Sequence, residues 1–403
     1  MKPFYLVAGV RTPFTKMGTA LAGLSAADLG VHAVKALLAR TGLDPAVVDE
    51  VIFGCVGQPA DAANIARVIA LRAGLPETTI ASTVHRNCAS GMEAFTTAFE
   101  RNQAGSGDVF ICGGAESMSR LPLIFPQGAG AKFARLASGR GQLERLGALF
   151  CFRPRDFAPR AALHMGLTDP VAGLNMGETA EILARDYHVT REAQDVFALR
   201  SHQHAAAAAE KLAEEIAPVY TEAGAVAADN GIRPNSDMGK LATLRPVFDQ
   251  ACGTVTAGNA SQISDGAVAL LAMSEAKMRA LGLEPLARLE RYAYAGCDPR
   301  RMGLGPVHAL SKAGRPIGEA EVIELNEAFA AQVLAVEKEL GGLPPEALNP
   351  NGGAIALGHP VGATGARLLL SCALEMQRRQ ARSGVATLCI GGGQGGAVWL
   401  ERD

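Results

Sequence analysis

The amino-acid sequence predicts an α/β protein in which helices cover a parallel sheet. Strand-like apolar runs alternate with helical patterns through residues 1–118, and the same alternation returns in residues 274–403. Such alternation is typical of strand–helix–strand units, whose consecutive strands run parallel. A chain with 48% hydrophobic residues, 5% aromatic residues and 46 glycines fits this class. Its 403 residues exceed what one hydrophobic core usually spans, so two or three domains are expected.

The first regular region contains alternating strands and helices with clear end signals. Strands are expected near residues 4–10, 50–55, 80–84 and 108–113, and helices near residues 26–40, 62–73 and 89–103. Ser25 and Asp28 form a capping box that begins the first helix. Gly74 and Gly105 stand just past the ends of the other two helices.

Residues 119–250 interrupt this regularity, because prolines and basic residues break the pattern and one long helix near residues 190–215 dominates. Regular texture returns at residues 251–273. Further strands are expected near residues 286–293, 321–325, 385–391 and 396–401. Both regular regions end in a cysteine followed by glycines, which indicates an internal duplication. We therefore expect a first half of residues 1–118 plus 251–273, an inserted domain at 119–250 and a second half at 274–403.

Charge and cysteine usage exclude several classes of protein. A net charge of −2 argues against broad attraction to nucleic acid or to an anionic membrane. The eight cysteines show no C-x-x-C pairs, so neither a zinc site nor a disulfide framework is indicated. No apolar window reaches membrane length. We expect a cytoplasmic protein without a membrane span.

Cys88 stands where a strand-like run ends and a helical run begins, in Asn87-Cys-Ala-Ser-Gly91. The free N–H groups and positive dipole end of a helix favour a thiolate, so a cysteine there can be a nucleophile. The alternative is a small buried residue at a tight junction.

Three further residues are candidates in the second half. His359 is surrounded by five glycines and two prolines within residues 349–365, although a loop imidazole bound to backbone is an alternative. Cys389 ends a strand before a glycine-rich turn, where α/β sites gather, or it is a core residue. Asn326 follows a strand, where its ordinary role is a helix N-cap.

The run from Gly391 to Gly396 formally fits the dinucleotide fingerprint, but the residues after it read as a strand and no helix opens there. Neither a phosphate-binding P-loop motif nor a G-x-S-x-G hydrolase motif occurs. Nucleotide-phosphate and serine-hydrolase functions therefore lack support.

Together these segments resemble the thiolases. The resemblance includes Asn326-Glu-Ala-Phe329, Gly358-His-Pro360 and Cys389-Ile-Gly-Gly-Gly393, and extends to residues 11–14, 113–118, 176–181 and 253–261 in the same order. It implies a duplicated thiolase fold, with two five-stranded mixed sheets in an α-β-α-β-α arrangement and an inserted loop domain that binds coenzyme A. It also implies an acetyl-CoA C-acyltransferase that cleaves or forms 3-ketoacyl-CoA.

In this family the residue matching Cys88 is acylated, and the residue matching His359 accepts its proton. Cys389 is then the acid/base next to the thioester carbon. Asn326 holds a water that, with His359, stabilises the enolate, and the N–H groups of Cys88 and Gly391 bind the acyl-enzyme oxygen. A transient enolate beside a thioester requires such preorganised donors.

The resemblance also implies substrate contacts and partners. Coenzyme A is a substrate rather than a cofactor, and no metal is expected. A homodimer or homotetramer and a place in fatty-acid β-oxidation are implied, with no nucleic-acid partner. The expected coenzyme A contacts are Asn175, Met176, Arg233, Ala257, Ser261 and Phe329.

Two rival functions remain. A ketoacyl synthase shares the general fold but normally pairs its cysteine with His and His or Asn, and Cys389 speaks against it. A catalytically silent thiolase-like carrier of acyl lipids would be expected to lack one of the reactive thiols or the histidine, which this chain retains.

Overall fold

The computed structural model describes residues 2–402 and contains one mixed sheet of ten strands. Along the sheet the order is β4-β3-β5-β10-β1 and then β11-β14-β13-β12, and the short β2 pairs with β10. Strands of the first half are β1 Phe4–Arg11, β2 Thr15–Lys16, β3 Glu50–Gly54, β4 Ile80–Val84, β5 Val109–Ser117 and β10 Ser264–Ser274. Those of the second half are β11 Ala287–Gly296, β12 Val322–Leu325, β13 Ser383–Ile390 and β14 Gln394–Glu401.

The sheet is mixed, so the parallel sheet expected from the alternation pattern was wrong for most of its pairs. Only β3 with β4, β3 with β5 and β12 with β13 run parallel among the named strands. The pattern could not reveal that β10 returns between β1 and β5, or that β13 and β14 form a hairpin. The mixed sheet implied by the resemblance is confirmed. Its second half has four strands, and Leu348 makes a single parallel bridge to Ile323 at the fifth position.

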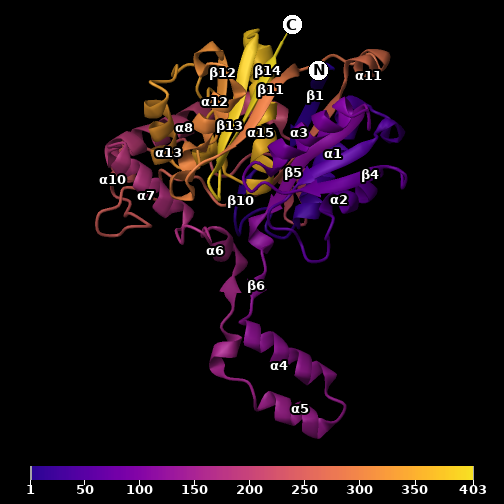
Figure 1. Cartoon of the computed structure of the whole chain (residues 1–403), viewed down its shortest axis with the longest axis vertical. Coiled ribbons are helices and arrows are strands. Elements are labelled where there is room, and N and C mark those ends of the chain that lie inside the picture. The colour runs from indigo at the N-terminus through magenta and orange to yellow at the C-terminus, as the bar shows by residue number, and fades with distance from the viewer. Residues whose placement is uncertain (1, 403) are drawn as a thin grey trace.

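Helices lie on both outer faces of the two half-sheets and between them (Figure 1). In the centre, α3 Ser90–Gln103 packs against α15 Val361–Arg379. The outer helices of the first half are α1 Ala26–Thr41, α2 Ile65–Ala73 and α11 Glu275–Ala280. In the second half they include α12 Gly305–Ala313 and α13 Ala330–Glu339. The result is the α-β-α-β-α layering that the resemblance implies.

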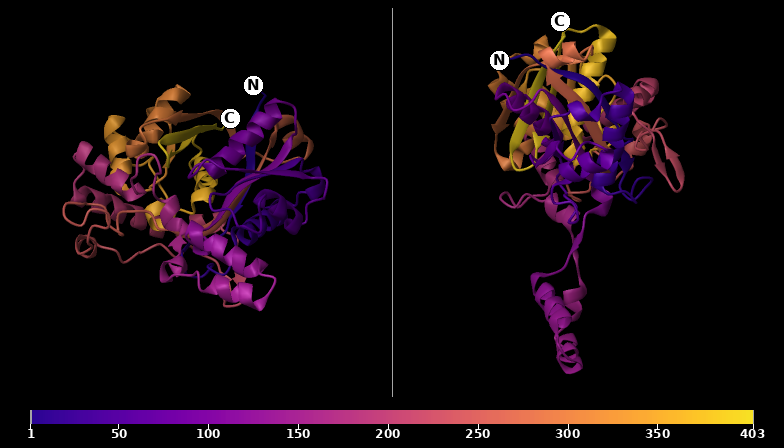
Figure 2. Two further views of the ribbon diagram at one scale, coloured as in Figure 1. Left: turned by 60° about the horizontal axis from the view of Figure 1, so that its bottom comes forward. Right: turned by 90° about the vertical axis from the view of Figure 1, so that its right-hand side faces the viewer.

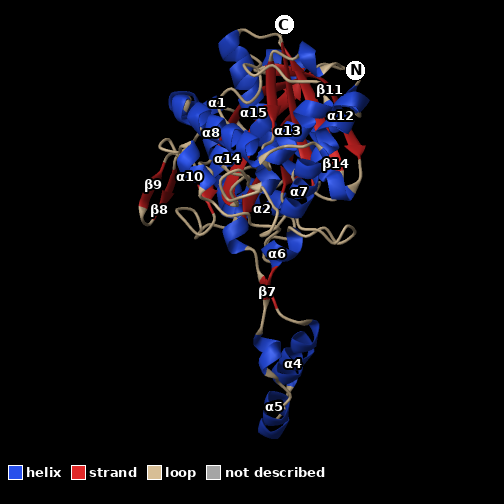
Figure 3. Cartoon of the chain, turned by 90° about the vertical axis from the view of Figure 1, so that its left-hand side faces the viewer, coloured by secondary structure: helices blue, strands red, loops and turns tan. Residues whose placement is uncertain are grey.

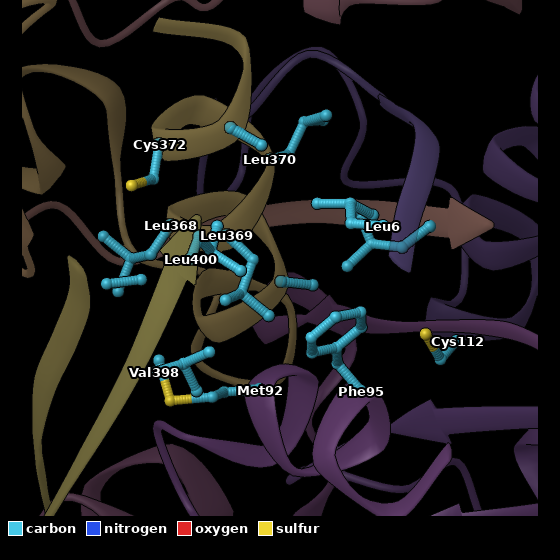
Figure 4. Packing of buried hydrophobic residues seen from close by; sticks show 14 of the residues in the cluster. Leu6, Met92, Phe95, Cys112, Leu368, Leu369, Leu370, Cys372, Val398 and Leu400 are labelled. Carbon is cyan, nitrogen blue, oxygen red and sulfur yellow. The ribbon is translucent and has the colours of Figure 1, made fainter. Parts of the chain in front are cut away.

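The central layer is a continuous apolar core (Figure 4). Met92 and Phe95 of α3 meet leucines of α15 and the inward side chains of β14. Glycines let the two helices approach backbone to backbone. A Cβ on Gly91 would lie 2.8 Å from the backbone N of Ala366, and one on Gly365 would lie 2.5 Å from the backbone N of Met92. The first turns of α3 and α15 therefore touch, which brings the segments of Cys88 and His359 to one place.

The inserted segment packs against the body through several helices and a hairpin. Its elements are α6 Ala162–Gly166, α7 Met176–Asp186, α8 Arg191–Ala207, α9 Ala209–Glu215, β8 Val219–Thr221, β9 Gly224–Val226 and α10 Met238–Ala242. The single helix expected near residues 190–215 is broken at Ala208 into α8 and α9. A buried ion network ties this segment to β1, because Arg11 binds Glu215 at 2.9 Å and Asp229 at 2.7 Å.

One part of the insertion leaves the body altogether. Residues 123–161, here named the arm, stand on a two-stranded stalk and project away from the molecule (Figures 2 and 3). The stalk is β6 Leu123–Ile124 paired with β7 Arg160–Ala161, and the arm continues into α4 Gln127–Ser138, α5 Gln142–Leu149 and the 3-10 helix Pro154–Phe157. Rings of Phe133, Phe152 and Phe157 pack together inside it. The sequence pattern did not predict this projection.

Candidate active site

Cys88 lies between the end of β4 and the start of α3, and its loop is held tightly. Asn87 takes a positive φ of 44°, and the hydroxyl of Ser90 donates to the carbonyl of Asn87 at 2.7 Å. The same hydroxyl oxygen accepts the N–H of Arg86 at 2.9 Å. These bonds fix the half-buried Cys88 just before the first turn of α3.

A residue of the second half reaches this loop. The side-chain amide of Asn87 donates to the carbonyl of Gly391 at 2.6 Å. Burial raises the pKa of the Cys88 thiol, whereas the N–H groups of Gly391 and of Cys88 itself lower it. Their effect on the pKa indicates that both N–H groups favour negative charge at this position, as the donors of an oxyanion site do.

Cys389 is the penultimate residue of β13 and is 1% exposed. Its apolar neighbours include Met176 and Phe329. Burial raises the pKa of this thiol well above its usual value, and the neighbouring Cys88 adds to the rise. Cys389 is therefore a neutral thiol close to Cys88, which suits a proton donor.

His359 stands between the short helix α14 Ala354–Leu357 and α15, and is 8% exposed. Gly358 before it has a φ of 104° and lies so close to Ser264 that a Cβ would clash, so only glycine fits there. Burial and the charge of Arg367 lower the pKa of His359 to about 4. The imidazole is therefore neutral at physiological pH and free to accept a proton.

One ring nitrogen of this histidine is held by a threonine. The Nδ1 atom of His359 lies 2.7 Å from the hydroxyl oxygen of Thr364. That hydroxyl donates to the carbonyl of Pro360 at 2.9 Å, so its oxygen is left to accept from Nδ1–H. This arrangement assigns the proton to Nδ1 and leaves Nε2 with the lone pair.

Asn326 follows β12 and is completely buried. It is not a helix N-cap, because α13 begins at Ala330 and Phe329 holds the cap position. Its backbone N–H donates to the carbonyl of Thr387 at 3.0 Å. Within residues 2–402 neither atom of its side-chain amide finds a hydrogen-bond partner. A buried amide in that state needs a polar partner, and water is the simplest one.

Both halves and the insertion line one cavity of about 700 Å³. Cys88 comes from the first half, Met176 from the insertion, and Gly391 and Val361 from the second half. The latter two stand two residues beyond Cys389 and His359. The remaining wall is largely apolar and includes Met118, Leu121, Leu163, Met165 and Leu167.

The expected coenzyme A contacts are spread over a wider area. Arg233 lines a separate cavity of about 310 Å³ together with Lys240 and Ser236. Ala257 is exposed, and the N–H of Ser261 donates to the carbonyl of Ala328 at 2.9 Å. These positions therefore do not share one wall with Cys88.

Two other expected contacts have structural roles as well. Asn175 caps α7, because its side-chain oxygen accepts the N–H of Gly177 at 3.0 Å. Phe329 packs edge to face against Phe248, with ring centres 6.2 Å apart. Both lie at or next to the helix and loop that carry Met176 and Asn326.

Sequence reasoning missed a carboxyl group in the main cavity. Glu116 of β5 lines it, and its carboxylate accepts the N–H groups of Val56, Gly57 and Gly362 at 2.8–3.0 Å. Burial raises the pKa of Glu116 to about 7, although these three bonds oppose the rise. The available signal was an acidic residue inside an otherwise apolar and glycine-rich strand.

No group of three or more His, Cys, Asp or Glu residues in the described part of the chain could hold a metal ion.

Two models of known protein domains match this chain, one after the other. The thiolase N-terminal domain matches residues 4–276, and the thiolase C-terminal domain matches residues 283–402.

The chain belongs to the thiolase family.

As a thiolase it is an acyltransferase, and its relatives agree along their whole length. A probable acetyl-CoA acetyltransferase of Escherichia coli is 44% identical, with 100% of each chain covered. The crystal structure of the Bacillus anthracis acetyl-CoA acetyltransferase superposes with a TM-score of 0.89 at 40% identity, covering 100% of this chain and 99% of the other. Human mitochondrial 3-ketoacyl-CoA thiolase in complex with CoA gives a TM-score of 0.89 at 37% identity, covering 100% and 98%.

Proposed function

We propose that this thiolase carries its acyl group on Cys88 while it interconverts 3-ketoacyl-CoA plus CoA with acyl-CoA plus acetyl-CoA. The observation that supports the proposal is that residues of the two halves meet next to Cys88. There the side-chain amide of Asn87 donates to the carbonyl of Gly391 at 2.6 Å, and the N–H of Gly391 lowers the pKa of the Cys88 thiol.

In thiolysis, His359 takes the Cys88 proton on Nε2 and the thiolate attacks the keto carbon of the substrate. His359 can accept this proton because its imidazole is neutral and its Nε2 lone pair is free, and the lowered pKa means that the proton is readily returned later. Negative charge then moves to the former keto oxygen, where the N–H groups of Cys88 and Gly391 stabilise it. Collapse of this adduct forms the Cys88 thioester and breaks the adjacent carbon–carbon bond.

The electron pair of the broken bond forms the enolate of acetyl-CoA. Cys389 donates its thiol proton to the enolate carbon and becomes a thiolate. Asn326, through a bound water, and protonated His359 stabilise the enolate oxygen, which gives the unpartnered amide of Asn326 a function.

Incoming CoA then restores the enzyme. Its thiol gives a proton to the Cys389 thiolate, and its sulfur attacks the Cys88 thioester. Acyl-CoA leaves, and the Cys88 sulfur recovers the proton that His359 had held. The same groups run the reverse condensation of two acyl-CoA molecules.

The coenzyme A moiety is proposed to extend from Cys88 toward Arg233. Met176, Ser261 and Phe329 border the pantetheine arm, with Asn175 and Ala257 near its path. Arg233 and Lys240 line one cavity and supply positive charge for the phosphates. No cofactor beyond this substrate is proposed.

The acyl chain is proposed to lie against the apolar wall of the main cavity. Leu121, Leu163 and Met165 line this cavity of about 700 Å³, which offers more room than a two-carbon acyl group fills. We therefore infer that the enzyme accepts 3-ketoacyl chains longer than acetoacetyl, as in fatty-acid β-oxidation. A cytoplasmic location and a dimer or tetramer are proposed from the family resemblance. No helix within residues 2–402 is long and apolar enough to cross a membrane.

Intact-mass measurement after incubation with acetyl-CoA tests the nucleophile. The wild type is expected to gain one acetyl group, and Cys88→Ala to gain none. Cys151→Ala is the matched control, since Cys151 is an exposed free thiol of the arm and its loss leaves acetylation unchanged. Acetylation of Cys88→Ala, or none of the wild type, contradicts the assignment.

A further inference from the structure

The arm differs from the rest of the protein in charge. Residues 123–161 contain seven Lys and Arg and two Asp and Glu, a local net charge of +5, whereas the whole chain carries −2. Six of the seven basic side chains are exposed, and the seventh, Lys132, pairs with Asp156 at 2.5 Å. The overall charge conceals this basic projection.

The end of the arm is also apolar. Leu143, Leu146, Leu149 and Phe150 follow one another at intervals of three, three and one residues, which places them on one face of α5 and its end. They are 89%, 53%, 53% and 84% exposed. Isolated exposed leucines are common, but three on one face of an eight-residue helix, with Phe150 just past its end, form a patch that calls for a partner.

More apolar side chains are exposed along the arm. Leu123, Ile124, Phe125 and Phe157 are each between 45% and 60% exposed. Contacts among Phe133, Phe152 and Phe157, with Phe125 against Phe133, supply the arm with its own small core, whereas Leu143 and Phe150 stand outside these ring contacts.

We propose that the arm docks on an anionic lipid surface. Helices that lie in a bilayer interface combine an apolar face, which enters the headgroup region, with basic side chains that meet anionic headgroups. The arm carries both an exposed apolar patch and exposed basic side chains. The patch belongs to a helical hairpin that projects from the body (Figure 1), so the arm can reach an extended lipid surface before the rest of the protein does.

A second copy of the chain is a poorer occupant. Joining two arms through α5 would bring two charges of +5 together, and like charges across an interface oppose association. An anionic bilayer instead neutralises this charge while it buries the leucines.

Docking would also orient the active site. The stalk leaves the body after Pro122 and returns at Ala162, and both residues line the main cavity. The rim of the cavity therefore lies at the foot of the docked arm. Docking would thus hold the cavity near the source of apolar acyl chains, and this consequence rests on the proposed function. The docking itself does not depend on the proposed catalytic roles.

Flotation of the full chain with lipid vesicles tests the proposal. Vesicles of phosphatidylcholine are compared with vesicles that also contain phosphatidylglycerol, at low and high salt. The wild type is expected to float with the anionic vesicles, and less so as salt rises. Leu143→Glu/Phe150→Glu and Arg140→Glu/Arg145→Glu are each expected to lower the bound fraction at least about tenfold.

Leu71→Glu is the matched control, because Leu71 is an exposed leucine on α2, outside the arm. It is expected to float like the wild type, and all variants are expected to retain thiolase activity in free solution. Wild type that stays unbound, or arm variants that still float, would overturn the proposal. So would a lipid-free oligomer that Leu143→Glu/Phe150→Glu dissolves, since the patch would then bind a second copy.

Discussion

Replacing Thr364 by Val should slow acylation of Cys88 without disturbing the fold. The substitution keeps the shape of the side chain but removes the oxygen that lies 2.7 Å from Nδ1 of His359. The carbonyl of Pro360 still accepts the N–H groups of residues 363 and 364, so the start of α15 stays in place. What changes is that Nδ1 of His359 loses its hydrogen-bond partner.

The size of the effect follows from the lost hydrogen bond. A buried N–H without an acceptor costs about 1–3 kcal/mol, so the ring favours the other tautomer, with the proton on Nε2. That tautomer cannot take the Cys88 proton through Nε2. Because 1.4 kcal/mol is a factor of ten, the productive tautomer falls roughly 5- to 150-fold, and the acylation rate falls with it.

Rapid quenching followed by mass measurement gives the rate of acyl-Cys88 formation directly. Thr364→Ser retains the oxygen and is expected to acylate at nearly the wild-type rate. The KM for CoA should stay close to wild type, and the melting temperature of Thr364→Val should fall by no more than the loss of these buried hydrogen bonds explains. If Thr364→Val acylates as fast as the wild type, Thr364 does not set the protonation of His359.

Three other substitutions test the remaining roles. Cys389→Ser is expected to form acyl-enzyme from acetyl-CoA but to lose most exchange of the acetyl methyl protons with deuterated water, and undiminished exchange by NMR would exclude Cys389 as the base. Arg233→Ala should raise the KM for CoA about fivefold, which is the contribution of one exposed charge pair. It should not change the KM for a pantetheine thioester that lacks the phosphates. An equal effect on both substrates would place the phosphates elsewhere. Leu163→Phe should lower kcat/KM for longer 3-ketoacyl-CoA substrates while sparing acetoacetyl-CoA, and a loss shared by both lengths would remove Leu163 from the acyl path.

Local signals in the sequence predicted much of the secondary structure. The Ser25 and Asp28 capping box forms as expected, and Gly74 ends α2 with a φ of 95°. Such features depend on residues within one turn, so they can be read from a short window. Strand pairing depends on distant segments, which is why the antiparallel return of β10 escaped the pattern.

The arm escaped prediction for a different reason. Its apolar residues suggest burial when read along the chain, yet Leu143 and Phe150 are more than four-fifths exposed. Periodicity shows that an apolar face exists but not what covers it. Only the structure shows that the body of the protein does not cover the apolar face of the arm.

Prediction of the candidate site was limited in the same way, because local settings can be recognised in the sequence whereas contacts between distant segments cannot. Cys88 and Cys389 stand in recognisable local settings, and the resemblance singled them out. The bonds that connect the site could not be read locally, because Asn87 and Gly391 are 304 residues apart, and Gly362 and Glu116 are 246 apart. The hydrogen bond from His359 to Thr364 spans five residues, but it requires the ring orientation that the fold imposes.

The bond between Asn87 and Gly391 also has a consequence during synthesis. At about 5–20 residues per second, the ribosome takes roughly 15–60 s to translate the 304 residues between them. For most of that interval the nascent chain contains Cys88 without the imidazole of His359, and the thiol of Cys389 and the amide of Gly391 come last. The nucleophile is thus kept from its catalytic partners until the second half is made, so an interrupted chain would not acquire a working acyl-transfer centre.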